Sequence, residues 1–343
     1  MSLDPDLAAF LDLVEASVIS GETPLMHTLS PQRARIEYDN ATRILDMPGP
    51  PVANITDIAI VCRDGESIDA RLYKPVEFAD AAGPFPVLLY FHGGGYCVGG
   101  LDSHDSLCRS LAALTPCCVL DVAYRLAPEY RFPTAVHDAQ DAYQWILSNG
   151  SQYALDSNRL AVGGDSAGGT LATGLALIAR EEKWPQPIYQ ILLYPCVSAR
   201  QDTESHRHFA EGYLLEEKTL QWMFMNYLRN EIDQTDWRFA PLQATDFDHL
   251  APAFLALAEY DPLVDEGMMY ADKLKAAGVS TRLKIYSGMI HDFARFGNIV
   301  QEAYQVRKDI ADVLREAFYP NGEGLEVEQG RALSNPNDVK EWI

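Results

Sequence analysis

The sequence predicts an α/β fold in which helices flank a mostly parallel central sheet. Short apolar runs that suit buried strands alternate along the 343 residues with longer runs that suit helices. The run 85–91 is apolar throughout, which is typical of a central strand buried on both faces. A chain of this length can bury one large core and still carry an accessory segment.

The N-terminal segment, residues 1–50, is predicted to be helical because Leu7, Phe10, Leu11 and Val14 recur at helical spacing. Prolines and glycine end this segment as a stiff linker just before the first strand. We therefore expect the segment to lie outside the core and to cover part of it. Simple peripheral packing is the alternative.

The core elements follow from the same patterns, and the turn at 63–66 makes the first two strands a hairpin. Strands are expected at 55–62, 68–73, 85–91, 117–122, 159–162, 187–194, 253–258 and 281–286. Helices are expected at 103–114, 135–147, 170–180, 268–277 and 299–318. The core thus occupies residues 51–199 and 251–318. The polar tail 319–343 has no core pattern, so we expect it to be disordered or to lie on the surface, or to form a dimer contact.

Residues 200–250 interrupt the core pattern and are richer in charged and aromatic residues. Leu220, Met223 and Tyr227 recur there at helical spacing. An insertion between two core strands is expected over the C-terminal edge of the sheet, where open α/β sheets bind ligands. Tyr213 is expected to begin the helical part, and it either lines a substrate pocket or packs the insertion on the core.

The composition limits the class of partner. With 49 acidic and 27 basic residues the net charge is −22, which argues against binding nucleic acid. No apolar run is long enough to span a bilayer and no secretory signal is evident, so we expect a cytoplasmic protein without membrane insertion. None of the six cysteines forms a Cys-x-x-Cys pair, and His206 and His208 have no further ligands nearby. Reduced thiols and no metal site are therefore expected.

One motif stands where a strand turns into a helix: Gly164-Asp165-Ser166-Ala167-Gly168. This is the context that a nucleophile elbow requires, because a serine on so tight a turn needs neighbours without a Cβ atom. The turn would lift the Ser166 hydroxyl to a helix N-terminus, where free N–H groups stabilise negative charge. The pattern is loose and can arise by chance, so the partner residues decide its meaning.

A run of three glycines, Gly93 to Gly95, follows His92 at the end of the central strand. Glycines at such a point let the backbone approach a ligand closely and direct N–H groups at it. The run predicts an oxyanion hole. A merely flexible loop is less consistent with His92 leading the run, and no phosphate-binding spacing is present.

A serine nucleophile needs a base and an acid that orients the base, and in α/β hydrolases these follow in the order serine, acid, histidine. Of the eight histidines only His291 lies after Asp261, and both follow predicted strands on the edge that carries Ser166. Asp261 should fix the imidazole tautomer while His291 takes the serine proton. Asp265 is the second choice for the acid, and Asp292 is poorly placed to bond the histidine next to it.

The loop 124–129 carries two opposite charges, Arg125 and Glu129. We expect them to form a buried ion pair that holds the loop, a structural role rather than a catalytic one.

With these residues in place the sequence strongly resembles the bacterial hormone-sensitive-lipase-like esterases, family IV of the α/β hydrolases, in the Asp-Ser-Ala-Gly branch. The resemblance covers about residues 40–318 and implies a helical cap formed by 1–50 and 200–250. The motifs that carry it are His92-Gly93-Gly94-Gly95, Tyr124-Arg125-Leu126-Ala127-Pro128-Glu129, Gly164-Asp165-Ser166-Ala167-Gly168-Gly169, Asp261-Pro262-Leu263-Val264-Asp265-Glu266-Gly267 and His291. The usual glycine after the histidine is Asp292 here.

The resemblance implies a carboxylesterase that acts on short- to medium-chain acyl esters and needs no cofactor. Its triad would be Ser166, Asp261 and His291. Further residues implied at the site are Gly93, Gly94 and Ala167 as oxyanion-hole donors and Asp165 and Tyr213 as substrate-binding residues. The partner would be a small-molecule ester, and a homodimer is possible. A non-catalytic binding protein on the same fold, or a serine peptidase or amidase, are the alternatives.

Overall fold

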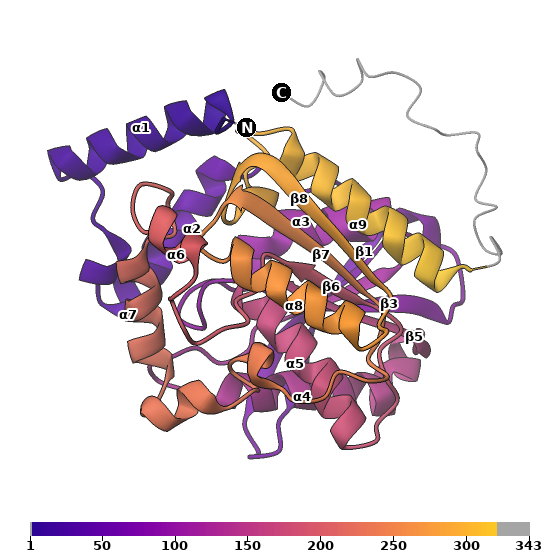
Figure 1. Ribbon diagram of the computed structural model, residues 1–343. Coiled ribbons are helices and arrows are strands. Elements are labelled where there is room, and N and C mark those ends of the chain that lie inside the picture. The colour runs from indigo at the N-terminus through magenta and orange to yellow at the C-terminus, as the bar shows by residue number, and fades with distance from the viewer. Residues whose placement is uncertain (1, 321–343) are drawn as a thin grey trace.

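A twisted sheet crosses the centre of the computed structural model, which describes residues 2–320 (Figure 1). Within these residues the sheet has eight strands in the order β1-β2-β4-β3-β5-β6-β7-β8. The strands are β1 (Asn54–Val61), β2 (Ser67–Lys74), β3 (Phe85–Phe91), β4 (Cys118–Val122), β5 (Leu155–Asp165), β6 (Gln190–Leu193), β7 (Ala253–Tyr260) and β8 (Thr281–Ile290). The predicted α/β fold is confirmed.

The sheet is parallel except at one end. β1 pairs antiparallel with β2 across the predicted hairpin, and β2 pairs antiparallel with β4. All later neighbours are parallel. Every residue of β3 is buried, as expected for an apolar strand covered on both faces. The carboxyl ends of the parallel strands therefore meet at one edge of the sheet.

Helices cover both faces of the sheet. One core cluster buries residues of α4, α5 and α8 against one face, and a second buries residues of α3 and α9 against the other. Short helices and the N-terminal helices complete the structure. The helices are α1 (Pro5–Ser20), α2 (Pro31–Leu45), α3 (Leu101–Leu114), α4 (Thr134–Asn149), α5 (Ala167–Glu181), α6 (Glu204–His208), α7 (Glu217–Tyr227), α8 (Val264–Ala276) and α9 (Glu302–Phe318).

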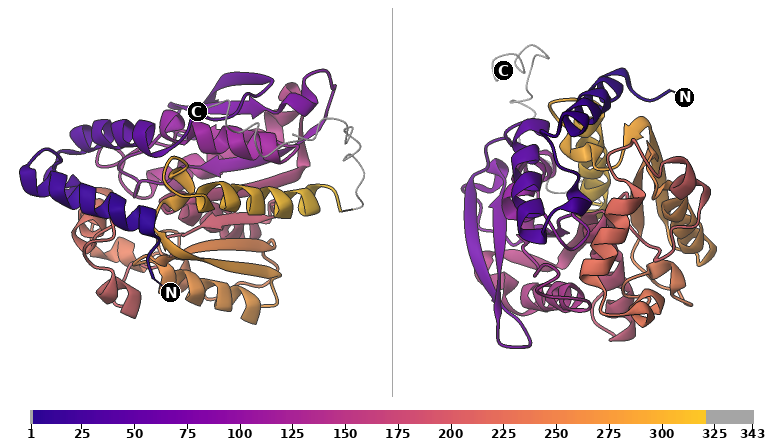
Figure 2. Two further views of the ribbon diagram at one scale, coloured as in Figure 1. Left: turned by 90° about the horizontal axis from the view of Figure 1, so that it is seen from above. Right: turned by 90° about the vertical axis from the view of Figure 1, so that its left-hand side faces the viewer.

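The N-terminal segment and the insertion lie at the same end of the molecule. The right-hand view of Figure 2 looks onto this end, where α1, α2 and α7 face the viewer. The short helix η1 (Met26–Thr28) of the N-terminal segment contacts α7 of the insertion. The prediction that Tyr213 begins a helix was wrong, because it lies in a bend and α7 begins only at Glu217.

Several other expectations concern the whole chain. All six cysteines are free thiols in the described part of the structure. None of the helices described there has the length and apolar character needed to cross a membrane. Residues 321–343, which make up most of the predicted tail, lie outside the described residues. Tyr319, at the start of the tail, donates a hydrogen bond from its hydroxyl to the carbonyl of Pro116 at 2.7 Å.

Candidate active site

Ser166 lies at a sharp turn between β5 and α5. Its backbone angles, φ 52° and ψ −119°, are unusual for a residue with a side chain. The turn can form only because its neighbours lack side chains: a Cβ atom on Gly168 would lie 1.9 Å from the Phe91 carbonyl oxygen, and one on Gly164 would lie 2.4 Å from Gly168. The predicted nucleophile elbow therefore has the required geometry.

His291 and Asp261 reach this turn from the ends of β8 and β7. The imidazole Nε2 of His291 lies 3.0 Å from Ser166 Oγ, and its Nδ1 lies 2.7 Å from Asp261 Oδ2. Asp261 is fully buried, and its other oxygen accepts the Leu263 N–H at 2.8 Å. Because a carboxylate only accepts hydrogen bonds, Nδ1 carries the proton and Nε2 faces the hydroxyl as an acceptor. The three predicted residues thus form one hydrogen-bonded chain.

The environment of His291 suits a base. Its burial would by itself lower the pKa of the imidazole, because a charged ring is disfavoured away from water. The charge of Asp261 and the hydrogen bond to it act in the opposite direction and prevail, so the pKa of His291 is raised above its ordinary value. A raised pKa makes this histidine a stronger proton acceptor than a free imidazole.

The other two candidate carboxylates make different contacts. Asp265 accepts the Ser205 N–H at 2.8 Å and so anchors the start of α6. Asp292 has a positive φ of 71°, and its Oδ2 accepts a hydrogen bond from Arg295 at 2.7 Å. Neither forms a hydrogen bond with His291 in the described structure.

The glycine run lies beside the turn that carries Ser166, because a Cβ atom on Gly93 would be 2.2 Å from Asp165 Oδ2. Its φ values are positive, 112° at Gly94 and 56° at Gly95. The expectation for Gly93 needs correction. Its N–H donates to Asp165 Oδ1 at 3.0 Å and is therefore not free to bind a ligand. Within residues 2–320 the N–H groups of Gly94, Gly95 and Ala167 form no hydrogen bond. The available donors thus lie one position further along the run than predicted.

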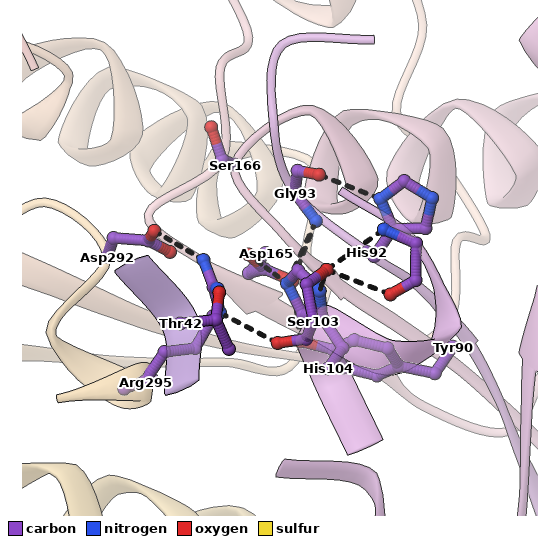
Figure 3. A network of polar contacts seen from close by, with 12 residues as sticks. Thr42, Tyr90, His92, Gly93, Ser103, His104, Asp165, Ser166, Asp292 and Arg295 are labelled. Atoms are coloured by element: carbon purple, nitrogen blue, oxygen red, sulfur yellow. Dashed lines mark hydrogen bonds and ion pairs between the residues drawn. The ribbon is translucent and has the colours of Figure 1, made fainter. Parts of the chain in front are cut away.

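Asp165, predicted to bind substrate, is fully buried instead. Its Oδ1 accepts the Tyr90 hydroxyl at 2.8 Å, and its Oδ2 lies 3.2 Å from His104 Nε2 (Figure 3). Burial alone would raise the pKa of Asp165, but the neighbouring His104 and Tyr90 lower it below its ordinary value. An ionised carboxylate held in this way joins the glycine run to the elbow rather than contacting a substrate.

Sequence reasoning missed the residues that hold Asp165. Tyr90 and His104 lie 75 and 61 positions away along the chain, and nothing in their own spacing marks them. His104 Nδ1 in turn lies 2.9 Å from the Ser103 hydroxyl. Nearby, His92 stacks on Tyr124 with ring centroids 4.2 Å apart. Burial lowers the pKa of His92 to about 3, so this ring is neutral and structural.

The predicted pairing of Arg125 with Glu129 was wrong. Arg125 instead pairs with Asp138 at 2.5 Å and with Asp64 at 2.6 Å. Glu129 pairs with Arg35 of α2 at 2.5 Å, and this hydrogen-bonded contact lowers the pKa of Glu129 to about 2. The loop is therefore fixed from outside, by α4 on one side and by the N-terminal segment on the other.

Helix α7 of the insertion packs against the glycine run. Met223 of α7 lies so close to Gly95 that a Cβ atom there would be 2.1 Å from its sulfur. Tyr213 is half-buried and packs on Phe209 and Tyr260, with ring centroids 5.0 and 5.8 Å away. These contacts attach Tyr213 to the core. No group of three or more metal-ligating side chains occurs among the described residues.

Comparison with known proteins finds relatives over most of the chain. Residues 88–295 match a family described as alpha/beta hydrolase fold. The ethyl acetate hydrolase of Pseudomonas putida is 41% identical over 317 residues, which cover 92% of this chain and 99% of that enzyme. The carboxylesterase NlhH of Mycobacterium tuberculosis is 35% identical over 256 residues, which cover 74% and 79% of the two chains.

Solved structures agree with these relatives. An ester hydrolase from the metagenome of Lake Arreo, complexed with a bipyridine phosphonate derivative, is 37% identical with a TM-score of 0.88. A hyperthermophilic esterase from the archaeon Pyrobaculum calidifontis is 34% identical with a TM-score of 0.85. Each match covers 92% of this chain and 99% of the other. The likeness therefore extends well beyond the central sheet.

Proposed function

The chain belongs to the α/β-hydrolase family, in its hormone-sensitive-lipase-like group, and from this premise we propose that it is a carboxylesterase with Ser166, His291 and Asp261 as its triad. One observation carries the assignment of residues: the unbroken hydrogen-bonded chain from Asp261 through His291 to Ser166 on a strained strand-to-helix turn. The activities named for two relatives, an ethyl acetate hydrolase and a carboxylesterase, agree with the reaction.

The reaction follows from the roles of these three side chains. His291 Nε2 takes the proton of the Ser166 hydroxyl while Oγ attacks the ester carbonyl carbon. The tetrahedral intermediate then collapses, the bond to the alcohol oxygen breaks, and the imidazolium gives its proton to the leaving alcohol. Water repeats the sequence on the acyl-enzyme and releases the acid. Throughout, Asp261 holds the imidazole orientation and stabilises its positive charge.

The negative charge of the intermediate needs preorganised donors. We assign this role to the free N–H groups of Gly94, Gly95 and Ala167, in place of the Gly93 group that serves Asp165. Ala167 also begins α5, whose N-terminus adds a favourable dipole. Donors of this kind contribute about 3–4 kcal/mol each to transition-state stabilisation in well-studied hydrolases.

The substrate class is proposed to be small esters with short to medium acyl chains, and no cofactor is required. Tyr213 stays a candidate for the pocket wall, in addition to its packing role. Six free cysteines fit the reducing cytoplasm that we propose as its location. A homodimer stays a prediction.

A panel of p-nitrophenyl esters of rising acyl length tests the proposal. We expect a higher kcat/KM for butyrate than for palmitate, and a loss of roughly three orders of magnitude or more in kcat for Ser166→Ala with the fold retained. Near-wild-type turnover by purified Ser166→Ala would contradict the proposal. Preference for p-nitroanilides over esters would identify an amidase, and no acyl-enzyme burst with any activated ester would indicate a binding protein.

A further inference from the structure

Helix α2 of the N-terminal segment contacts two loops of the candidate site through one face. These catalytic loops are the glycine loop, which runs from the glycine run to Cys97, and the turn after β8, which carries His291. Arg35, Tyr38 and Thr42 are spaced three and four residues apart, so their side chains project from the same side of the helix. Arg35 Nε donates to the carbonyl of Cys97, at the end of the glycine loop, at 2.9 Å. Tyr38 and Thr42 contact Arg295, which follows the catalytic histidine. The two loops are thus joined by a single helix.

Arg295 is the centre of the second contact. Only 3% of it is exposed, and its guanidinium lies 4.6 Å over the ring of Tyr38. It donates to Asp292 Oδ2 at 2.7 Å, to the Ser103 carbonyl at 3.3 Å, and to the hydroxyls of Tyr38 and Thr42. A buried guanidinium is stable only when such partners satisfy it. The network therefore holds α2 and the turn after β8 in one arrangement.

Asp292 is the residue that links this network to the reaction. It follows His291 directly and has a φ of 71°, a conformation that glycine adopts freely and aspartate only with strain. Its carboxylate accepts hydrogen bonds from Arg295 at 2.7 Å and from the Tyr38 hydroxyl at 3.4 Å. The strain is thus offset by contacts of the side chain. Figure 3 shows Asp292, Arg295 and Thr42 together on the left, with Ser166 above them.

We propose that Asp292, Arg295 and Tyr38 are positioning residues, which fix the catalytic turn of His291 against α2 while Arg35 fixes the glycine loop against the same helix. The helix then sets the distance between the base and the oxyanion donors. The N-terminal segment on this basis supports the chemical step itself and does not merely cover the substrate. This inference rests on the proposed esterase function.

The decisive variant is Asp292→Gly, because glycine suits the local backbone and removes only the side-chain contacts. We expect kcat for p-nitrophenyl butyrate to fall about tenfold with KM changed less than about twofold. A displaced His291 slows the chemical step but leaves substrate binding largely unchanged. Tyr38→Phe, which removes one hydroxyl, should lower kcat in the same direction but less. Ile44→Ala, on the same helix at a side chain that is 74% exposed, is the matched control and should leave both constants unchanged.

Two further measurements separate the possible outcomes. If the network acts as one unit, the losses caused by Asp292→Gly and Tyr38→Phe will not add in the double variant. Amide hydrogen exchange of residues 35–45 should become faster in Asp292→Gly than in wild type. A kcat for Asp292→Gly equal to or above that of wild type, or additive losses, would overturn the inference. Wild-type protein that hydrolyses no ester would instead refute the proposed function. The exchange measurement would still test whether Asp292 and its contacts hold α2 in place.

Discussion

The strained backbone of Ser166 is the local condition on which the site depends. A non-glycine residue with φ 52° and ψ −119° costs about 1–3 kcal/mol, and the surrounding structure must supply this energy. It does so through the Ser166 N–H, which donates to the carbonyl of Leu193 at 2.8 Å, and through the close approach of Gly168 to Phe91. We therefore expect substitutions at Gly168 to disrupt the turn itself rather than the chemistry alone.

The first prediction concerns Asp261, the proposed acid of the triad. Asp261→Asn should lower kcat by roughly 10³- to 10⁴-fold, because an amide favours the wrong imidazole tautomer. Asp265→Asn should change kcat by less than about tenfold, since Asp265 contacts Ser205 and not His291. Steady-state kinetics on p-nitrophenyl butyrate measure both. The reverse ranking of the two variants would reassign the acid.

The second prediction follows from the raised pKa of His291. In the proposed mechanism the neutral imidazole is the base, so kcat/KM should fall as the pH drops below this pKa, by about tenfold per pH unit. Because Asp261 raises the pKa of His291, the midpoint should lie above the value of about 6.5 of a free histidine. A pH–rate profile from pH 4 to 9 measures it. Activity that stays constant down to pH 4 would exclude a histidine base.

Among individual residues, the sequence predicted those that belong to a motif or follow a fixed order along the chain. It missed the residues whose role depends on a partner far away in the sequence. Ser166, Asp261 and His291 follow from one motif and from the order of groups along the chain. Gly93 was predicted as a free donor although its N–H binds Asp165, because sequence cannot show which N–H of a glycine run faces a neighbouring carboxylate. That carboxylate, Asp165, was predicted to bind substrate because the sequence does not reveal its distant partners Tyr90 and His104.

At the scale of elements, the apolar runs predicted every strand but not every boundary. β5 extends beyond the expected 159–162 on both sides, because pairing with β3 continues past its most apolar residues. β6 covers only Gln190–Leu193 of the expected 187–194. The predicted pairing of Arg125 with Glu129 was wrong because each residue pairs with a side chain of a neighbouring helix, which sequence spacing does not reveal. The loop is not helical, and α4 and α2 supply the actual partners.

The third prediction tests the anchor of this loop. Asp138 is fully buried on α4 and pairs with Arg125, whose side chain is 11% exposed. Asp138→Asn should lower the free energy of unfolding by about 2–4 kcal/mol, because the arginine then lacks its buried counter-charge. Asp141→Asn, on the same helix and paired with the more exposed Arg63, should cost about 1 kcal/mol or less. Denaturant unfolding of both variants measures the difference, and equal losses would contradict it.

At the scale of the whole molecule, the two N-terminal helices differ in how they meet the body. α1 extends from the body in Figure 1, and Leu7 is its only fully buried residue. α2 contributes the buried residues Ala34 and Thr42 and contacts both catalytic loops. The chain after α2 is held separately, by the buried ion pair between Asp46 and Arg307 at 2.7 Å. The two helices can therefore be removed in steps without breaking that pair.

The last prediction uses this difference. Deletion of residues 1–24 should keep kcat for p-nitrophenyl butyrate within about threefold of wild type, since few buried contacts are lost. Deletion of residues 1–45 keeps Asp46 but removes Tyr38 and Thr42, which contact Arg295, and Arg35, which contacts the carbonyl of Cys97. It should lower kcat by about 100-fold and abolish the preference for butyrate over palmitate. Thermal unfolding checks that each shortened protein is folded. If the protein beginning at Asp46 keeps wild-type kcat, α2 serves only as a cover, and the base and oxyanion donors are positioned by the core alone.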